Sequence, residues 1–326
     1  MPEAAKSDLF VGVDLGGTKI LAGVFTPQLK LLQTAKLSTK SSRGFDPVVE
    51  RVARCVRDAV DEADMSVKQV RAVGVGAPGA VDPESGEVIF APNLQWKDAP
   101  LKKELEQLLE IPVFVENDCN ACTLGVHEVE LKGKPRNMLG LFLGTGIGGG
   151  LILEGKLYRG FSGTAGEIGH MVLQVGGPKC GCGNNGCFEA LASRTALFRE
   201  IQQRVKDGEK TVLTEMLGAE LDDLKSGDLR KAIRKGDKLV EKVLESAAEF
   251  TGIAVANLIN VFNPEVIVLG GGVIDALEDE LMAIIVETAL DYAMPGTTKG
   301  VEIIASELGD NAGITGAAVL AKQRFK

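Results

Sequence analysis

Two glycine-rich turns of the sequence contain residue types that bind phosphate. The first runs Asp14-Leu15-Gly16-Gly17-Thr18-Lys19, and the second runs Gly144-Thr145-Gly146-Ile147-Gly148-Gly149-Gly150. Glycine lets backbone N–H groups approach a phosphate without a clash from Cβ. The first turn adds a carboxylate for a magnesium shell, a hydroxyl group and a cation, and the second adds a hydroxyl group. Together they predict a site for the phosphates of a nucleotide.

Two other phosphate motifs fit the second turn less well. Gly144-x-Gly146-x-x-Gly149 matches the dinucleotide fingerprint, but that motif opens a helix. Here a strand at 151–153 is expected to follow. Gly150-x4-Gly155-Lys156 is close to a P-loop, yet Leu157 stands where Ser or Thr would bind magnesium. A plain tight hairpin remains the alternative for either turn taken alone.

A cluster of cysteines follows the second turn. Cys180-x-Cys182-x4-Cys187, with His170 upstream, supplies three thiolates and an imidazole. This is a complete tetrahedral ligand set for Zn²⁺ with no position left for water, so it predicts a structural zinc site. Free cysteines in a loop are the alternative. The remaining cysteines and the second histidine are expected to be packing residues, with a surface position also open for the histidine: Cys55, Cys119, Cys122 and His127.

Composition and charge limit the classes of partner. The 326 residues are 45% hydrophobic and 25% charged, as in an ordinary globular protein, and the net charge is −9. An acidic chain is not expected to bind nucleic acid, which requires a basic surface. The segment 1–8 lacks the apolar run of a signal peptide, and no stretch approaches the roughly 20 apolar residues of a membrane span. We therefore expect a cytoplasmic protein without a membrane partner, whose clustered thiols bind metal rather than form disulfides.

The elements that must position these residues alternate between strands and helices. Asp46 is predicted to cap a helix that Pro47 opens, because Val49, Val52, Ala53, Val56 and Val60 form an apolar stripe at helical spacing. Another helix is expected to start at Asn117 or Asp118. Strands are predicted at 9–13, 20–25, 70–75, 113–115, 138–143, 150–153, 266–269 and 301–305, and further helices at 277–292 and from 312. This alternation predicts an α/β fold.

The order of strand, glycine-rich turn and strand occurs near residue 14 and again near residue 145. A repeat at about half the chain length predicts two related domains facing one cleft. We place the N-terminal α/β domain at 1–122, with the C-terminal helix at about 310–326 able to join it. The second domain is placed at 123–309, with the zinc loop and an oligomerisation surface.

Several segments taken together resemble the ROK family of sugar kinases and sugar-responsive repressors, and are most like its bacterial glucokinases. The resemblance covers nearly the whole chain. Its most specific part is the His–Cys–Cys–Cys spacing with a downstream glutamate. The segments are Asp14–Lys19, Glu116–Asp118, Gly144–Gly150, Gly166–His170 and Cys180–Glu189. The resemblance implies two ribonuclease-H-like domains of the actin-like ATPase type, with ATP and sugar in the cleft between them.

The resemblance also implies roles for individual residues. Asp118 matches the catalytic base, and its position at the end of a strand suits a residue that takes the proton of a sugar hydroxyl. The matching sugar contacts are Asn93, Asn117, Asp118, Glu167, His170 and Glu189. The nucleotide would be bound by Asp14, Gly16, Gly17, Thr18, Lys19, Gly144, Thr145, Gly146 and the adenosine turn Gly270, Gly271 and Gly272. Zinc would be held by His170, Cys180, Cys182 and Cys187.

The expected activity is ATP- and Mg²⁺-dependent phosphorylation of a hexose at its 6-hydroxyl, with glucose as the first choice. Fructose, N-acetylmannosamine or N-acetylglucosamine as substrate, and polyphosphate as donor, remain alternatives. A repressor of the same family is a remote alternative, because only 13 residues precede Asp14 and a DNA-binding module would not fit there. An actin-like structural ATPase would leave the cysteine cluster unexplained. The family commonly forms homodimers or homotetramers.

Overall fold

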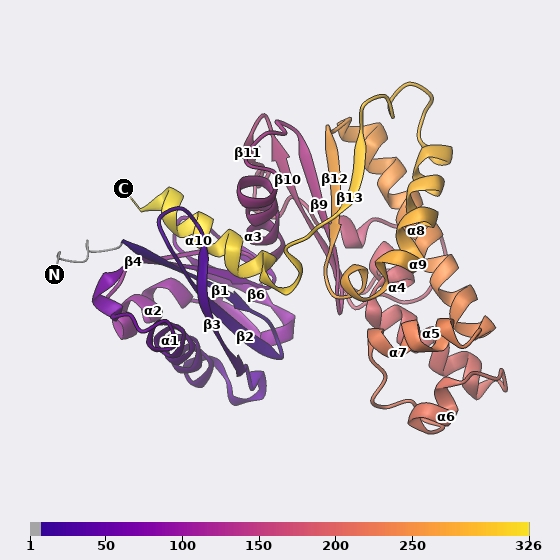
Figure 1. Ribbon diagram of the computed structural model, residues 1–326, viewed down its shortest axis with the longest axis horizontal. Coiled ribbons are helices and arrows are strands. Elements are labelled where there is room, and N and C mark those ends of the chain that lie inside the picture. Colours follow the sequence, from indigo (N-terminus) through magenta and orange to yellow (C-terminus); the bar gives the residue numbers. More distant parts are fainter. Residues whose placement is uncertain (1–7, 326) are drawn as a thin grey trace. The chain divides into compact units, whose positions relative to one another are not determined.

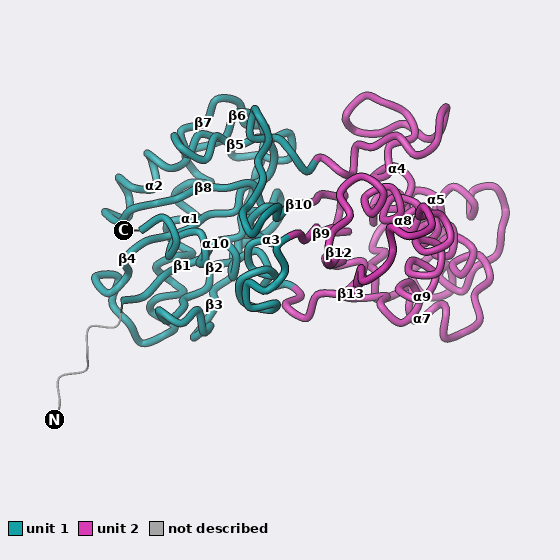
Figure 2. Tube along the Cα trace, turned by 90° about the horizontal axis from the view of Figure 1, so that it is seen from above, with its two compact units in different colours: residues 1–136, 150–166, 310–326 teal, residues 137–149, 167–309 magenta. Residues whose placement is uncertain are grey.

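The computed structural model describes residues 8–325 and divides into two compact units (Figure 2). Of the described residues, unit 1 contains 8–136, 150–166 and 310–325, and unit 2 contains 137–149 and 167–309. The expected division into folding domains after residue 122 stays a prediction. Within residues 8–325, no helix is both long enough and apolar enough to span a membrane.

Two five-stranded sheets confirm the α/β class and the internal repeat. The first has the order β3-β2-β1-β4-β8, and the second has the order β11-β10-β9-β12-β13. In both, the first strand in the chain lies centrally, between the second and the fourth. The first sheet consists of β1 (Leu9–Leu15), β2 (Lys19–Phe25), β3 (Leu31–Ser38), β4 (Val70–Ala77) and β8 (Val113–Asn117), and the second of β9 (Met138–Leu143), β10 (Ile147–Leu153), β11 (Lys156–Leu157), β12 (Val266–Gly270) and β13 (Glu302–Ala305).

The first sheet is covered by helices on both faces (Figure 1). β1 pairs antiparallel with β2 and parallel with β4, and β4 pairs parallel with β8, so the carboxyl ends of β1, β4 and β8 lie at one edge. One face packs on α1 (Phe45–Glu62) and α2 (Leu101–Leu109), and the other on α10 (Ala312–Arg324). A small sheet of β5 (Ala80–Asp82), β6 (Glu87–Ala91) and β7 (Trp96–Ala99) follows β4.

Helix α10 packs unusually close to the first sheet because two central strands present glycine to it. A Cβ at Gly12 of β1 would collide with the carbonyl oxygen of Ile314, and a Cβ at Gly74 of β4 would collide with that of Ala317. Glycine is therefore required at both positions. The close packing brings the first turn of α10 against the carboxyl end of β1, where a Cβ built on Gly313 would come within 3.0 Å of the Asp14 carboxyl carbon.

Unit 2 is mainly helical beyond its sheet. The long helix α8 (Lys238–Phe262) packs along α9 (Ile274–Tyr292), and the buried face of α8 is rich in alanine and valine. β12 pairs parallel with β9 and β13. Further elements, in chain order across both units, are α3 (Asp118–Gly125), α4 (Phe188–Ala192), α5 (Arg194–Lys206), α6 (Leu213–Leu217), α7 (Ser226–Arg234), α8 (Lys238–Phe262) and α9 (Ile274–Tyr292), with short helical turns η1 (Ser41–Arg43), η2 (Val67–Gln69), η3 (Pro92–Leu94), η4 (Val126–Glu130), η5 (Ile168–His170) and η6 (Gly309–Asn311).

Two local predictions were wrong. Asp46 does not cap α1: the helix begins at Phe45, and Gly44, with φ of 88°, takes the cap position. Positive φ is accessible to glycine, so the chain turns earlier and Asp46 lies in the first turn, where its charge favours the helix dipole. The second glycine turn is also shorter than expected. β10 already begins at Ile147, so Gly149 and Gly150 belong to the strand, where a Cβ on either residue would collide with neighbouring groups.

The predicted burial was confirmed for α1 and for Cys55. The five apolar residues of the α1 stripe are all buried, and Cys55 is buried among them. His127, for which packing and surface positions were both open, is buried in η4. Its Nδ1 lies 3.1 Å from Glu128 Oε1, and its Nε2 lies 2.9 Å from the Pro135 carbonyl.

Candidate active site

The carboxyl end of β8 forms the cap of α3. Asn117 is the N-cap residue, as one of the two predicted alternatives had it, and its Oδ1 accepts the N–H groups of Cys119 and Asn120 at 2.9 and 3.0 Å. Its Nδ2 donates to the Gly79 carbonyl at 3.0 Å. Asp118, the predicted base, is the first residue of α3, and its Oδ1 accepts the Cys119 N–H at 2.8 Å. The second Nδ2 hydrogen of Asn117 is what this side chain can offer to a ligand.

Asp14, at the carboxyl end of β1, is held in a setting that disfavours its charge. The pKa of Asp14 is raised from 3.8 to about 7, chiefly by burial; the charges of Asp118 and Asp310 contribute to the rise, and Lys19 opposes it. The parallel arrangement of the strands accounts for the proximity of Asp14 and Asp118, because both follow strands that end at the same edge of the sheet. A carboxyl group in this setting needs a proton or a cation as its partner.

The first glycine turn is braced by its own backbone. The Gly16 N–H donates to the Lys19 carbonyl at 2.9 Å, and Thr39, which is fully buried, donates through Oγ1 to the Gly16 carbonyl at 2.6 Å. Lys19 Nζ lies 3.0 Å from Asp310 Oδ1 on η6. The turn therefore uses the N–H of Gly16 internally, which leaves those of Gly17 and Thr18 as its candidates for phosphate.

Asn93, a predicted sugar contact, lies beside the first turn. A Cβ built on Gly17 would come within 3.3 Å of the Asn93 Cβ and within 3.2 Å of its carbonyl oxygen. Asn93 is the middle residue of η3, which leads into the only tryptophan of the chain, Trp96.

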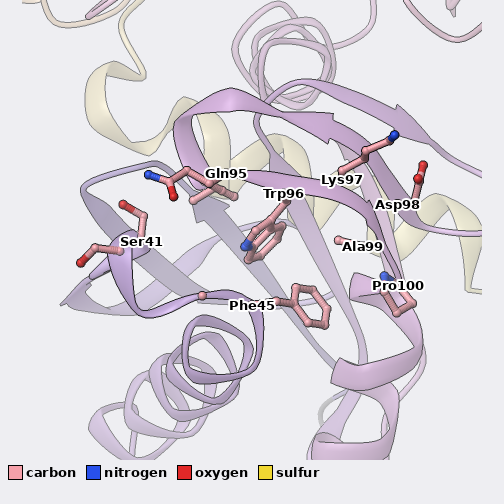
Figure 3. A pocket seen from close by; sticks show the side chains of 11 residues that line it. Ser41, Phe45, Gln95, Trp96, Lys97, Asp98, Ala99 and Pro100 are labelled. Carbon is pink, nitrogen blue, oxygen red and sulfur yellow. The ribbon is translucent and has the colours of Figure 1, made fainter.

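A pocket of about 320 Å³ is lined by the residues that follow Asn93 in the chain, from Leu94 to Pro100 (Figure 3). Ser41, Phe45, Gln95 and Trp96 line it, together with neighbouring residues that include none of the predicted site residues. The Phe45 and Trp96 rings meet edge to face at 4.9 Å. The indole nitrogen of Trp96 is buried and has no hydrogen-bond partner among the described residues.

The second turn is a tight loop in unit 2 that contacts the start of α5. The Gly144 N–H donates to the Gly146 carbonyl at 2.8 Å. Thr145 is held from α5: the Arg194 guanidinium donates to its Oγ1 at 2.5 Å, and Thr195 Oγ1 donates to its carbonyl at 2.7 Å. Arg194 thus places a cation beside the hydroxyl group that was predicted to contact phosphate.

Glu189 joins the second turn to the cysteine cluster. Its Oε2 accepts the Ile147 N–H at 3.0 Å, and a Cβ at Gly146 would collide with the same oxygen. The Cys180 thiol lies 3.7 Å from its Oε1. A predicted sugar contact and a predicted phosphate contact are therefore neighbours within unit 2.

The four predicted metal ligands lie together. One ligand atom from each of His170, Cys180, Cys182 and Cys187 falls within 4.8 Å of every other. Burial raises the pKa of Cys180 to about 12 and also raises that of Cys187, whereas the Asn184 N–H lowers the pKa of the exposed Cys182. On the other side of the imidazole, His170 Nε2 lies 3.8 Å from Glu167 Oε2. The structure thus brings a Cys₃His cluster together with Glu167 and Glu189.

The third glycine segment lies between β12 and α9. Gly271 has a φ of 87°, and a Cβ there would meet the Leu143 carbonyl, so glycine is needed for both conformation and space. The Val273 N–H donates to that same carbonyl at 3.0 Å. The segment is therefore fixed against the end of β9, one residue before the second turn begins.

Sequence reasoning missed four residues next to these groups. Asp310 and Arg194 contact predicted phosphate-binding residues, and Glu116 is paired with Arg159 behind Asn117. Glu116 stood inside a motif that we singled out, but without a role. The Asp310–Lys19 and Glu116–Arg159 pairs span 291 and 43 residues of chain, and no local pattern in the sequence signals such pairings.

Known proteins are similar to this chain over nearly its whole length. The chain is 36% identical to a glucokinase of Thermotoga maritima over 317 residues. The matched region covers 97% of this chain and 98% of that protein. It superimposes with a TM-score of 0.86 and 35% identity on a ROK family glucokinase from Streptomyces griseus, solved in complex with glucose and AMPPNP, over 97% of this chain and 99% of that one.

Repressors are also among the similar proteins. A xylose repressor of Bacillus subtilis is 28% identical over 98% of this chain, and the match spans 78% of the repressor. The family model described as "ROK family" matches residues 10–324. On this match over nearly the whole length, the chain belongs to the ROK family.

Proposed function

We propose that the protein is an ATP-dependent hexokinase that phosphorylates glucose at its 6-hydroxyl. The observation that carries the proposal is the similarity, over 97% of this chain, to a glucokinase whose structure holds glucose and an ATP analogue. The repressor alternative is less well supported, because the Thermotoga maritima glucokinase is 36% identical to this chain and the Bacillus subtilis xylose repressor 28% identical.

Asp118 is the group we assign to the acceptor hydroxyl. As a carboxylate it accepts the proton of the sugar 6-hydroxyl as the bond to the γ-phosphorus forms, while the bond from that phosphorus to the β,γ-bridging oxygen breaks and ADP leaves. Its Oδ1 accepts the Cys119 N–H, which orients the carboxylate at the start of α3. Asn117, Asn93, Glu167, His170 and Glu189 are proposed to hold the remaining hydroxyl groups.

The phosphates are assigned to the glycine turns. Gly17 and Thr18 of the first turn, and Thr145 and Gly146 of the second, offer N–H and hydroxyl groups, and Lys19 offers a cation. Gly270, Gly271 and Gly272 are proposed to contact adenosine. Mg²⁺ would neutralise phosphate charge during transfer. Asp14 fits as a group of the magnesium shell, because its buried carboxyl needs a positive partner and has Lys19 as the one cation that lowers its pKa.

The cysteine cluster fits structural zinc. Zn–S bonds of about 2.3 Å and Zn–N bonds of about 2.0–2.1 Å in a tetrahedron put two sulfurs about 3.8 Å apart, and a sulfur and a nitrogen about 3.6 Å apart. Cys182 Sγ and Cys187 Sγ are 3.7 Å apart, and so are Cys180 Sγ and His170 Nδ1. We propose that His170 uses Nδ1 for the metal and presents Nε2 to the sugar, with Glu167 and Glu189 held by the same loop.

A homodimer is proposed through unit 2. Four apolar side chains near the ends of α8 and α9 are between 47% and 73% exposed, and the Met294 N–H donates to Asn260 Oδ1, which brings the two ends together. These side chains are Val261, Leu290, Tyr292 and Met294. Light scattering coupled to size-exclusion chromatography should give a mass of two chains for the wild type. The Val261→Asp variant should have the mass of a single chain. A monomeric wild type would refute this assignment.

The test of the activity is a coupled assay with Mg·ATP and a panel of hexoses that includes fructose, mannose, N-acetylmannosamine and N-acetylglucosamine. Glucose is expected to give the highest kcat/KM, and polyphosphate in place of ATP is expected to give little turnover. Because Trp96 is the only tryptophan and lies close in sequence to Asn93, its fluorescence supplies an independent reading of sugar binding. Transfer to no hexose would refute the proposal.

A further inference from the structure

A buried carboxylate lies directly behind the proposed catalytic segment. Glu116 is the residue before Asn117 in β8, and it is 1% exposed. Its Oε2 accepts the Arg159 Nε–H at 2.7 Å. Arg159 follows β11 and belongs to the same unit, and its side chain is 29% exposed. The pair therefore joins two segments that are far apart in the chain and reaches from solvent to the interior of unit 1.

The other oxygen of Glu116 is engaged by groups at the start of α3. Oε1 accepts the Asn117 N–H at 3.1 Å and Asn120 Nδ2 at 3.1 Å. Three donors thus converge on one carboxylate, which is the arrangement a buried anion requires. Asn120 is itself 2% exposed, and its Oδ1 is buried without a partner among the described residues. The amide of Asn120 is therefore oriented by Glu116 rather than by a second bond of its own.

Arg159 is the first residue of a short loop whose two ends are joined by a hydrogen bond. The Ala165 N–H donates to the Arg159 carbonyl at 3.1 Å, and the hydroxyl groups of Ser162 and Thr164 are 2.9 Å apart. The loop continues toward Glu167 in the sequence. The Arg159 guanidinium is thus attached to a loop with internal hydrogen bonds, which helps to fix the position of the ion pair with Glu116.

The hydrogen bonds of Glu116 hold the segment in which the proposed function places the residues at the reacting hydroxyl. Glu116 holds the backbone N–H of Asn117, and Asn117 caps the helix whose first residue is Asp118. A displacement of the β8 end by about 1 Å would move the Asp118 carboxylate out of reach of a hydroxyl, and misplacement on that scale is known to cost about a hundredfold in rate. A buried ion pair adds little stability over an apolar pair of the same shape, so stability alone gives a weak reason for it.

We propose that Glu116 and Arg159 are positioning residues for phosphoryl transfer, which fix the main chain of Asn117 and the direction of the Asp118 carboxylate. The proposal rests on the proposed function. It assigns no proton transfer and no substrate contact to either residue. The positioning role has the consequence that loss of the Glu116–Arg159 pair lowers kcat more strongly than it weakens the binding of ATP or sugar.

The decisive variant is Glu116→Gln, which keeps the size of the side chain and one acceptor but removes the charge that Arg159 requires. We expect kcat to fall between about tenfold and a hundredfold, with KM for ATP changed less than about threefold. Arg159→Gln should give a similar fall, and the double variant should be no slower than the slower single variant, because the two residues act through one contact. Arg159→Lys, which keeps a cation, should recover part of kcat.

Glu106→Gln is the matched control. Glu106 of α2 also accepts a backbone N–H, that of Val113 at 3.0 Å, but at the opposite end of β8. The Glu106→Gln variant should have a lower unfolding temperature than the wild type, but its kcat should not fall as that of Glu116→Gln does. If Glu116→Gln loses no more kcat than Glu106→Gln does, or if the losses of the two single variants add in the double variant, the pair is structural and the proposal is wrong.

The order of the measurements separates this proposal from the proposed function. Wild-type turnover on the hexose panel is measured first, and its absence would refute the kinase activity itself. A wild type that is active, with a Glu116→Gln variant that is equally active, would refute only the positioning role. Should Glu116→Gln fail to fold, Arg159→Lys decides the question, because the Arg159 side chain is partly exposed and lysine leaves the buried Glu116 carboxylate a cation as its partner.

Discussion

Glu189 occupies the space that a side chain at residue 146 would need. Its Oε2 accepts the N–H of Ile147, and a Cβ on Gly146 would collide with that oxygen. In the proposed function Gly146 serves phosphate and Glu189 serves sugar. Direct contact within unit 2 thus couples the two roles, so a substitution at one of the two residues is expected to displace the other.

Gly146→Ala should therefore impair sugar binding although residue 146 is assigned to phosphate. The added methyl group pushes the Glu189 carboxylate away, and the hydrogen bond to Ile147 is lost or stretched, at a cost of about 1–3 kcal/mol. We expect the dissociation constant for glucose, measured by calorimetry without nucleotide, to rise about tenfold. Gly144→Ala is the control, because a Cβ there meets nothing closer than 3.9 Å, and it should bind glucose normally. Equal glucose affinity in the two variants would contradict the coupling.

Removal of metal should loosen the loop that carries Glu167 and Glu189. Metal analysis of freshly purified protein is expected to find about one zinc per chain. Chelation should lower both the unfolding temperature and the affinity for glucose, since ligand-bound zinc contributes directly to folding free energy. Cys182→Ser should reproduce both losses and should not respond further to chelator. Cys122→Ser, which lies outside the cluster, should keep the response of the wild type. Zinc-free protein that binds glucose normally would count against the support role.

The stability of the metal-free protein should fall as the pH rises toward 7 because of Asp14. The pKa of this carboxyl is raised from 3.8 to about 7 in the folded state. A raised pKa means that the folded state holds the proton more tightly than the unfolded state, so the stabilisation is complete below pH 3.8 and is lost progressively up to about pH 7.

Asp14→Asn provides the measurement. The variant cannot ionise, so its free energy of unfolding relative to wild type should increase by about 3 kcal/mol between pH 5 and pH 8, without Mg²⁺. Urea unfolding at both pH values, with chelator and without nucleotide, measures this difference. Asp310→Asn is a useful comparison, because its carboxylate is largely exposed and its pair with Lys19 should contribute less than about 1 kcal/mol. A difference between Asp14→Asn and wild type that does not vary with pH would show that Asp14 is not the titrating group.

The sequence predicted the elements of the fold well where local chemistry determines them. The stripe of α1, the cap at Asn117 and the repeat of strand, turn and strand are all set by short-range patterns, and the structure confirms them. The start of α1 was missed by two residues, because Gly44 at positive φ allowed a turn that Asp46 alone does not reveal.

The parts of the candidate site that depend on packing could not be predicted. Glu116 lies in a motif that the sequence made conspicuous, but its partner Arg159 is 43 residues away and its burial follows from the packing of a loop. The contact of Gly146 with Glu189 likewise depends on how the cysteine cluster folds against β10. Residue types indicated the chemistry here, and three-dimensional packing determined which groups meet.

The central claim is tested most directly by transfer of phosphate from ATP to glucose, measured side by side for the wild type and Asp118→Asn. The account predicts turnover by the wild type with a kcat of roughly 1–1,000 s⁻¹, and a loss of at least about a hundredfold in Asp118→Asn, which should still bind glucose with an affinity close to that of the wild type. A wild type that transfers no phosphate to glucose, or an Asp118→Asn variant that keeps its rate, would contradict it.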